Sequence, residues 1–313
     1  MVKFMNRIPA GTFLVPMILS AIVYTIWPNL FSNIGGVTDA FLGGSGTSFL
    51  VGILSFCSGM GINVKTLGKL FKHHGVLVIA KFVLCVALGL LYITFFGQSG
   101  VLGISALAFV VTLCSINPAL YISLVSGYGD EIDVAAFGLI GLFGIPAAPM
   151  FIYAVASHGT IDWMPIFSTI LPLILGIFLG NADKEFPKLF GPAISVLLPI
   201  LGWNIGQGMN LVEGLQSGVY GILLVIVFYL FMSPLYLTDK KVLKNDGVVG
   251  LSMTAVAGVS ASFPAIIAQA NPDIAPYVTG ATAQIVTAAL ITSLLTPVIV
   301  RKLYKKEHPI DPK

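Results

Sequence analysis

Long uninterrupted runs of apolar residues constrain the fold of this chain more than any other feature of its sequence. Apolar residues make up 57% of the 313 positions and charged residues 9%, with a mean hydropathy of +0.97. Soluble domains carry about 25% charged residues, and about 20 consecutive apolar residues are enough to cross a bilayer as a helix. The sequence therefore predicts an all-α integral membrane protein and excludes a soluble multidomain protein.

Ten membrane spans follow from reading the apolar runs between polar residues, glycines and prolines. The first five are expected at residues 11–27, 46–64, 74–96, 101–125 and 133–156. The second five are expected at residues 164–181, 191–208, 217–237, 248–270 and 275–300. The first run lacks the small-residue cleavage site of a signal peptide, so we interpret it as a retained helix. Residues 1–156 and 157–313 thus form two five-helix halves.

The basic residues indicate how these spans are oriented. Short cytoplasmic loops of membrane proteins carry an excess of lysine and arginine. If the N-terminus is cytoplasmic, all but one of the 16 basic residues fall in cytoplasmic segments, and the exception is Lys81 in span three. The external loops carry only acidic charges, namely Asp39, Asp162, Glu213 and Asp273. We expect a multi-pass protein of the plasma (inner) membrane with both termini in the cytoplasm.

Two segments of the first half recur in the second half. Residues 59–64 (Gly-Met-Gly-Ile-Asn-Val) align with 206–211 (Gly-Gln-Gly-Met-Asn-Leu), and 117–119 align with 263–265, at offsets of 147 and 146 residues. Because each half has an odd number of spans, the second half must enter the membrane from the opposite side. Inverted repeats of this kind can exchange conformations and so give alternating access to a central site.

Spans four and nine each contain a proline in mid-run, Pro118 and Pro264. Proline removes an amide donor and clashes with the preceding turn, so each helix is expected to break there. Freed backbone groups must then face protein, water or a ligand, and half-helix N-termini attract anions. A packing kink would explain either proline alone, but a symmetry-related pair with polar neighbours favours a binding site. These neighbours are Ser115, Asn117, Ser260 and Ser262.

Lys81 is the only charged residue deep within a predicted span. Burying a cation in a membrane costs several kcal/mol unless the charge is paired or hydrated. The lysine could attract an anionic solute, carry a proton, or extend its side chain to the cytoplasmic surface. Span ten adds Thr282 and Gln284 as candidate ligand contacts, although contacts between helices would explain them equally well.

Other residues with chemical potential have structural explanations. The three cysteines lie in apolar runs without the spacing of a disulfide framework or a metal site, so buried packing is expected for Cys57, Cys85 and Cys114. Solvated positions are expected for His73, His74, His158 and His308, and helix capping for Asp130, Glu131 and Asp133. We expect no metal and no cofactor. The net charge of +3 without a basic stripe excludes a nucleic-acid partner.

Several short stretches, in a fixed order along nearly the whole chain, carry a family resemblance. They are Ile8-Pro9-Ala10-Gly11 with Val15-Pro16, Phe56-Cys57-Ser58-Gly59, Lys81, Leu120-Tyr121 with Tyr128-Gly129-Asp130, Leu179-Gly180-Asn181-Ala182-Asp183, Asp246-Gly247 and Ala281-Thr282-Ala283-Gln284. Together they resemble the 2-keto-3-deoxygluconate permeases, a family that looks related in fold to the bile-acid sodium symporters. The resemblance implies ten helices, with four and nine broken and crossing, in a core domain beside a panel domain. It also implies uptake of a sugar-acid anion coupled to protons.

The chain departs from the family pattern in three spans. Pro118-Ala119 replaces a Gly-Gly pair in span four, no acidic residue precedes Gly144-Ile145-Pro146 in span five, and span nine lacks the glutamate of the sodium-coupled relatives. With no carboxylate inside a span, a coupled proton falls to Lys81 or to the substrate, unless transport is uncoupled. A different organic anion, with sodium or no coupling, is the alternative.

An intramembrane enzyme and a channel are the rival classes. Gly127-Tyr128-Gly129-Asp130 matches the Gly-x-Gly-Asp signature of aspartyl intramembrane proteases, but that chemistry needs a second carboxylate within a span. A channel is disfavoured because a ring of charged residues is missing. The sequence therefore favours a secondary transporter whose partners are a small anionic solute and bilayer lipid, and it leaves open whether the protein is a homodimer.

Overall fold

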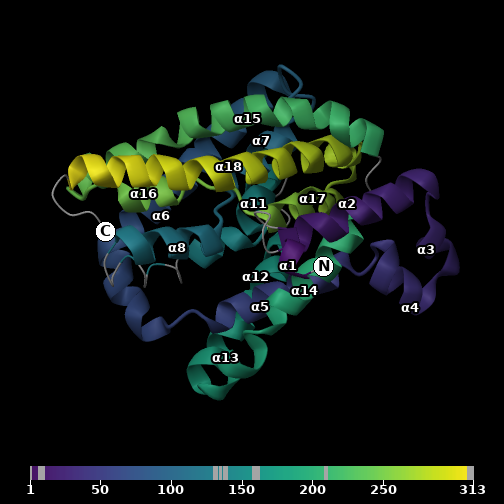
Figure 1. The fold of residues 1–313 in the computed structure, drawn as a ribbon, viewed down its shortest axis with the longest axis horizontal. Coiled ribbons are helices and arrows are strands. Elements are labelled where there is room, and N and C mark those ends of the chain that lie inside the picture. Colours follow the sequence, from purple (N-terminus) through teal and green to yellow (C-terminus); the bar gives the residue numbers. More distant parts are fainter. Residues whose placement is uncertain are drawn as a thin grey trace.

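The computed structural model describes residues 2–5, 11–129, 133, 136, 140–156, 163–207 and 211–308. Within these residues the regular structure is helical, apart from one isolated bridge between Val101 and Ile104. The longest helices, α15 (Leu211–Leu237) and α18 (Val278–Glu307), lie side by side along the long axis of the molecule (Figure 1). The prediction of an all-α membrane protein is confirmed.

The helices of the first half occupy the first five predicted spans. They are α2 (Gly11–Ile26), α5 (Thr47–Met60), α6 (Val64–Phe96), α7 (Ala106–Cys114), α8 (Pro118–Tyr128) and, after the 3-10 turn η2 (Gly141–Gly144), α11 (Ala147–Ala156). Short elements at the N-terminus and between spans one and two are α1 (Val2–Met5), α3 (Leu30–Ile34), α4 (Gly36–Thr38) and the π-helix η1 (Asp39–Gly43). Span three is longer than predicted because α6 begins at Val64, ten residues before the expected start at 74.

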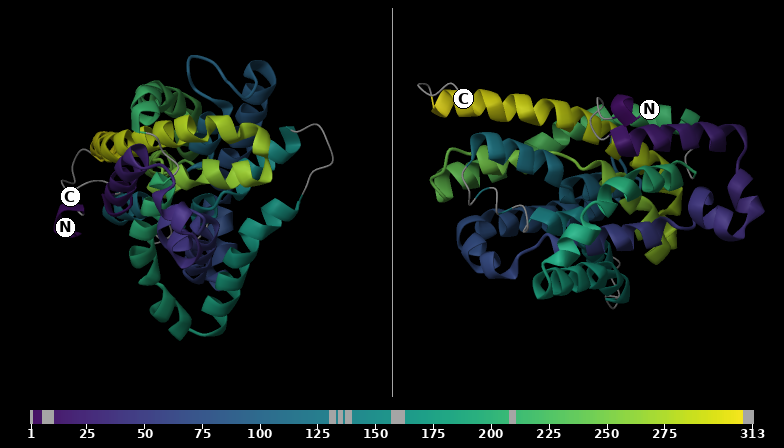
Figure 2. Two further views of the ribbon diagram at one scale, coloured as in Figure 1. Left: turned by 90° about the vertical axis from the view of Figure 1, so that its right-hand side faces the viewer. Right: turned by 60° about the horizontal axis from the view of Figure 1, so that its bottom comes forward.

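The second half has the same order of elements. Besides α15 and α18 it contains α12 (Met164–Ala182), α13 (Glu185–Phe190), α14 (Ala193–Gly206), the π-helix η3 (Thr238–Val242), α16 (Val248–Ser252), the 3-10 helix η4 (Gly258–Ser262), α17 (Phe263–Ala270) and the 3-10 helix η5 (Pro272–Tyr277). Figure 2 shows α12 and α14 descending to a common tip at α13.

The helices pack in two groups. In one group, α2 packs along α14, α5 along α12, and α14 also contacts α5. In the other group, α15 packs along α18, α6 contacts α7 and α11, and α18 contacts α7 and η4. Contacts between the groups are fewer and run mainly through α11 with α12 and α14 with η4. The broken spans four and nine therefore lie inside the second group.

Two glycines allow the helices of the first group to pack closely. A Cβ added at Gly59 in α5 would lie 2.3 Å from the carbonyl oxygen of Leu173 in α12. A Cβ added at Gly206 in α14 would lie 2.2 Å from the carbonyl oxygen of Met17 in α2. Small residues let membrane helices approach until their backbones touch, which strengthens dispersion contacts where lipid removes the hydrophobic driving force. Both crossings therefore depend on glycine.

Fewer helices pass a simple length criterion than the ten predicted spans. In the described residues, three continuous helices are long and apolar enough to cross a membrane, and a fourth candidate is the bent pair Gly36–Gly43 and Thr47–Met60. Shorter apolar helices of 10–17 residues occupy most of the remaining spans. A span broken into two helices fails such a criterion because neither part is long enough alone.

Candidate functional site: the crossing of two broken helices

Span four breaks where the sequence predicts. Helix α7 ends at Cys114 and α8 begins at Pro118, and between them Ser115 and Asn117 adopt extended backbone conformations. Pro118 lies in the first turn of α8, where its missing N–H would have no partner in any case. The Asn117 side chain caps the same helix, because its Oδ1 accepts a hydrogen bond of 3.1 Å from the backbone N–H of Leu120.

Span nine also breaks, but earlier than predicted. Helix α16 ends at Ser252, residues 254–257 are not helical, and η4 then leads directly into α17. Pro264 lies in the first turn of α17, after the break rather than at it. The expectation of a break at Pro264 is therefore wrong in position, since a proline in a first turn follows a 3-10 helix without losing a hydrogen bond.

The two breaks lie against each other, and we call the segments 115–117 and 254–260 the crossing. The Asn117 backbone N–H donates a 2.7 Å hydrogen bond to the carbonyl oxygen of Ala255. The Ala257 backbone N–H donates a 2.8 Å bond to Ser115 Oγ, which is 2.7 Å from Ser260 Oγ. The backbone groups that each break frees are thus bound partly by the other break, which meets the requirement for irregular backbone at membrane depth.

Helix α18 supplies two further partners for the crossing. Thr292 Oγ1 accepts a 3.0 Å hydrogen bond from the Val256 N–H, and Thr296 Oγ1 donates a 2.9 Å bond to the Thr254 carbonyl oxygen. Both threonines are buried. The sequence analysis missed them, although their spacing of four residues on one face of span ten was a signal that could have identified them.

The remaining polar candidates lie near the crossing or away from it. Ser262 Oγ donates to the Val259 carbonyl oxygen within η4. Thr282 and Gln284 are buried on α18, and Gln284 Nε2 donates a 2.8 Å bond to the Gly103 carbonyl oxygen in the segment before α7. Their role in binding stays a prediction.

Lys81 lies on the inside of the protein. Its side chain is 0% exposed, so the interpretation that it extends to the surface is wrong. In the described part of the chain, the only atom within hydrogen-bonding distance of Nζ is Met232 Sδ, at 3.7 Å. Nζ also lies 5.5 Å from the ring centre of Phe228 and 5.8 Å from that of Phe143. The ammonium is therefore surrounded by sulfur and aromatic rings rather than by a carboxylate.

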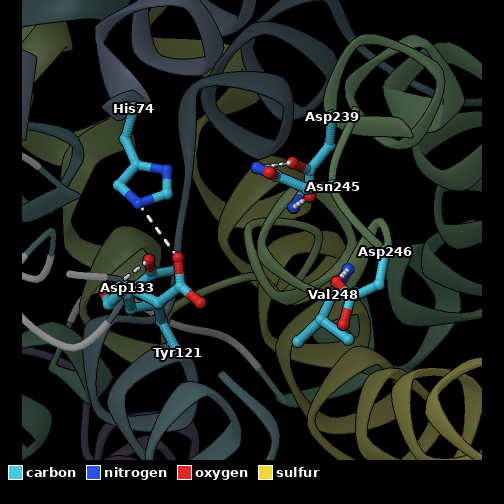
Figure 3. Close-up of polar contacts among 8 residues, drawn as sticks. His74, Tyr121, Asp133, Asp239, Asn245, Asp246 and Val248 are labelled. Atoms are coloured by element: carbon cyan, nitrogen blue, oxygen red, sulfur yellow. Dashed lines mark hydrogen bonds and ion pairs between the residues drawn. The ribbon is translucent and has the colours of Figure 1, made fainter. Parts of the chain in front are cut away.

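A second polar cluster contains His74, whose Nε2 lies 3.0 Å from Asp133 Oδ1 (Figure 3). Tyr121 in α8 donates a 3.0 Å hydrogen bond to the Asp133 backbone carbonyl oxygen. The expected solvated position of His74 is wrong, because the extended α6 places this residue inside the protein with 4% exposure. Asp133 was expected to cap a helix, and its carboxylate pairs with His74 instead. Asp130, Glu131 and His158 lie outside the described residues.

The connection between spans eight and nine carries a buried carboxylate, Asp239, on the other side of this cluster (Figure 3). It accepts hydrogen bonds of 2.9 Å from Asn245 Nδ2 and 2.8 Å from the Gly250 N–H in α16. Asp246 accepts a 2.9 Å bond from the Val248 N–H. Both carboxylates therefore bind the first-turn amides of α16, the helix that leads into the break of span nine.

The fold and this site define the class of the molecule: a multi-pass helical membrane protein in which two broken helices cross. Residues 2–309 match the family described as 2-keto-3-deoxygluconate permease. A permease of that name from Pectobacterium carotovorum is 33% identical, with 97% of each chain covered. Those from Enterobacter sp. and Bacillus subtilis are 32% and 30% identical, covering 98% of this chain and 94% and 96% of theirs.

The chain therefore belongs to the 2-keto-3-deoxygluconate permease family. It is a membrane transport protein and not an enzyme, since the family and its similar relatives are permeases.

Proposed function

We propose that this protein imports 2-keto-3-deoxygluconate, a sugar-acid anion, by proton symport with alternating access at the crossing. The cargo is that in the names of the similar permeases. The observation that carries the mechanism is the pairing of Ser115 with Ser260 where the two broken helices meet. Broken helices at the interface of two repeats are where secondary transporters bind their substrates.

Ten spans in two inverted repeats are part of this proposal. The two glycine crossings support it, because the carbonyl groups of Met17 and Leu173 approach glycines that are 147 residues apart. Each of these two residues directly follows a proline, Pro16 or Pro172, and the prolines are 156 residues apart. Equivalent residues of the two halves thus make equivalent contacts, with span one on span seven and span six on span two.

A second pair of contacts repeats in the same way. Ser20 Oγ donates a 2.6 Å hydrogen bond to the Trp203 carbonyl oxygen, and a Cβ added at Gly176 would lie 2.0 Å from the Phe56 carbonyl oxygen. Ser20 and Gly176 are 156 residues apart, and Phe56 and Trp203 are 147 apart. The same two offsets apply to both pairs of contacts, which favours a common inverted architecture over chance. The two packing groups correspond to panel and core domains.

The conformation described here is closed at the crossing. Of the seven predicted site residues only Asn117 is partly exposed, while Lys81, Ser115, Ser260, Ser262, Thr282 and Gln284 are buried. In the described part of the chain, Asn117 Oδ1 is used by the helix cap and Nδ2 has no hydrogen bond. This free donor lies at the N-terminal end of α8, where the helix dipole also favours an anion. We assign the first contact with the substrate carboxylate to Asn117.

Transport in proteoliposomes tests the function. We expect saturable uptake of radiolabelled 2-keto-3-deoxygluconate that an inward proton gradient accelerates and a sodium gradient does not, with both termini on the cytoplasmic side in cells. Transport of other sugar acids but not of this one would overturn the substrate. Sodium-driven or gradient-independent uptake would overturn the coupling, and single-channel currents would overturn the carrier mechanism.

Asn117→Asp tests the binding site more sharply. Aspartate caps a helix as well as asparagine does, so thermal stability in detergent is expected to stay near the wild-type value. Its negative charge repels an anionic cargo, and we expect substrate affinity to fall at least tenfold. Asn117→Ser is the matched control, since serine keeps the cap without the charge and is expected to bind more tightly than the aspartate variant. Equal affinity of the two variants would remove Asn117 from the site.

A further inference from the structure

We propose that Lys81 couples proton movement to substrate movement, binding the substrate carboxylate in its protonated form and crossing the empty cycle as a neutral amine. This inference rests on the proposed function and adds the chemistry of coupling to it. It answers a specific difficulty, namely that no predicted span contains a carboxylate that could carry the proton.

The surroundings of Lys81 make a permanent charge unfavourable. Removing an ammonium from water is costly unless a counter-charge and hydrogen bonds replace its hydration. Here the side chain is fully buried, its one hydrogen-bonding contact is a weakly accepting sulfur, and two aromatic rings add attraction. Contacts with aromatic rings offset only part of the lost hydration. The empty site therefore favours the neutral amine, and a bound carboxylate restores the balance in favour of the ammonium.

Lys81 lies beside the break of span four. Cys85, one helical turn further along α6, donates a 3.1 Å hydrogen bond from its thiol to the Leu113 carbonyl oxygen, in the last turn of α7. Cys85 and Cys114 are the titratable groups that act electrostatically on Lys81. Cys114 directly precedes Ser115, so the amine and the crossing are joined through consecutive residues. A substrate held at the crossing can therefore place its carboxylate toward Lys81.

Other titratable groups on neighbouring elements are already engaged or more distant along the fold. Asp239 in η3 binds the α16 amides, and Tyr229 in α15 lies 2.8 Å from Thr296 Oγ1. Tyr153 in α11 is buried and has a partner of its own. His74 lies on the same helix face as Lys81, about 10 Å away along α6 at 1.5 Å per residue, and pairs with Asp133. None of these groups replaces Lys81 as the group next to the crossing.

The cycle balances charge and protons. In the outward-facing state the amine takes one external proton, and the resulting ammonium pairs with the carboxylate of one substrate monoanion. The neutral pair crosses to the inward-facing state, where the anion leaves and the ammonium then loses its proton to the cytoplasm. The empty carrier returns uncharged. One proton therefore moves with each monoanion, no covalent bond changes, and no net charge crosses the membrane.

The test compares two driving forces on reconstituted wild-type protein. A proton gradient of one pH unit, inside alkaline, is expected to support about tenfold accumulation of 2-keto-3-deoxygluconate, because a tenfold concentration ratio balances a one-to-one coupling. A potassium diffusion potential without a pH gradient is expected to support none. Accumulation driven by the potential alone would overturn the inference while leaving the proposed function intact, whereas no transport of this substrate at all would overturn both.

Lys81→Arg separates binding from coupling, since arginine stays protonated. We expect this variant to exchange internal for external substrate within about threefold of the wild-type rate, because the loaded carrier is neutral. Net accumulation is expected to be lost, because the empty carrier now holds a buried charge. Lys188→Arg, which changes an exposed lysine paired with Glu185, is the control and is expected to keep both activities. Accumulation by Lys81→Arg at the wild-type level would overturn the inference.

Discussion

The Ser115 hydroxyl is the most informative single group to remove from this protein. Its oxygen accepts a 2.8 Å hydrogen bond from the Ala257 N–H and lies 2.7 Å from Ser260 Oγ. Both serines are 0% exposed, so water cannot replace either bond. Ser115→Ala removes this oxygen and changes little else, because the backbone of residue 115 is extended and alanine adopts that conformation as readily as serine.

The expected cost follows from counting the groups that lose a partner. A buried N–H left without an acceptor, here that of Ala257, costs about 1–3 kcal/mol. The Ser260 hydroxyl loses one hydrogen bond, a net contribution of about 1 kcal/mol. Ser115→Ala is therefore expected to lower the free energy of unfolding by about 2–4 kcal/mol. The variant also loosens the contact between the two broken helices, and we expect slower substrate exchange.

Reversible unfolding in mixed micelles, titrated with a denaturing detergent, measures this free energy. Ser233→Ala is the matched control, because Ser233 is exposed and its Oγ donates to the Leu230 carbonyl oxygen in its own helix. Its expected effect is within about 0.5 kcal/mol. If Ser115→Ala destabilises the protein no more than Ser233→Ala does, the two breaks are not held together as described, and the crossing cannot be the rigid centre of the site.

Three further predictions concern the packing around the crossing. Gly59→Ala and Gly206→Ala each force a methyl group against a backbone carbonyl oxygen, and we expect each to cost about 1–3 kcal/mol and to lower the yield of monodisperse protein, whereas Gly52→Ala, with open space around it, is tolerated. Asp239→Asn replaces a buried carboxylate that accepts two hydrogen bonds, and we expect a loss of about 1–3 kcal/mol in the same unfolding assay together with slower transport. Thr292→Val keeps the side-chain volume but leaves a buried N–H unpaired, and we expect a cost of about 1–3 kcal/mol.

Each of these predictions has a result that contradicts it. Tolerance of either glycine substitution, with size-exclusion profiles like that of Gly52→Ala, would contradict the close helix crossings. An Asp239→Asn variant as stable as Asp39→Asn, which alters an exposed loop carboxylate, would show that α16 does not depend on this cap. Thr292→Val matched to wild type in stability would mean that the break of span nine finds its partners elsewhere.

The break in span four was predictable from local chemistry, and the break in span nine was predictable only in kind. Pro118 follows Asn117, a residue that caps helices well, so the local sequence both ends one helix and starts the next. Pro264 has no such neighbour, and the chain passes through it in helical geometry. The break of span nine lies at 254–257 because partners there, the span-four backbone and the α18 threonines, come from distant parts of the chain.

Lys81 and His74 show the same limit for side chains. Nothing in the residues next to them distinguishes a lysine that reaches the surface from one enclosed by Met232 and Phe228, which lie about 150 positions later in the chain. The predicted position of His74 failed because helix α6 continues ten residues beyond the apolar run, where a polar sequence packs inside the protein.

By itself the sequence determined that this protein crosses the membrane as helices, because apolar runs and unpaired backbone groups leave no other solution in lipid. It also determined the family and which two spans are interrupted. Only the tertiary structure decided where the second interruption falls, which groups satisfy it, and that the one intramembrane cation is enclosed. These features depend on contacts between residues far apart in the chain, and hydrogen bonding and desolvation are properties of such contacts rather than of any single stretch of sequence.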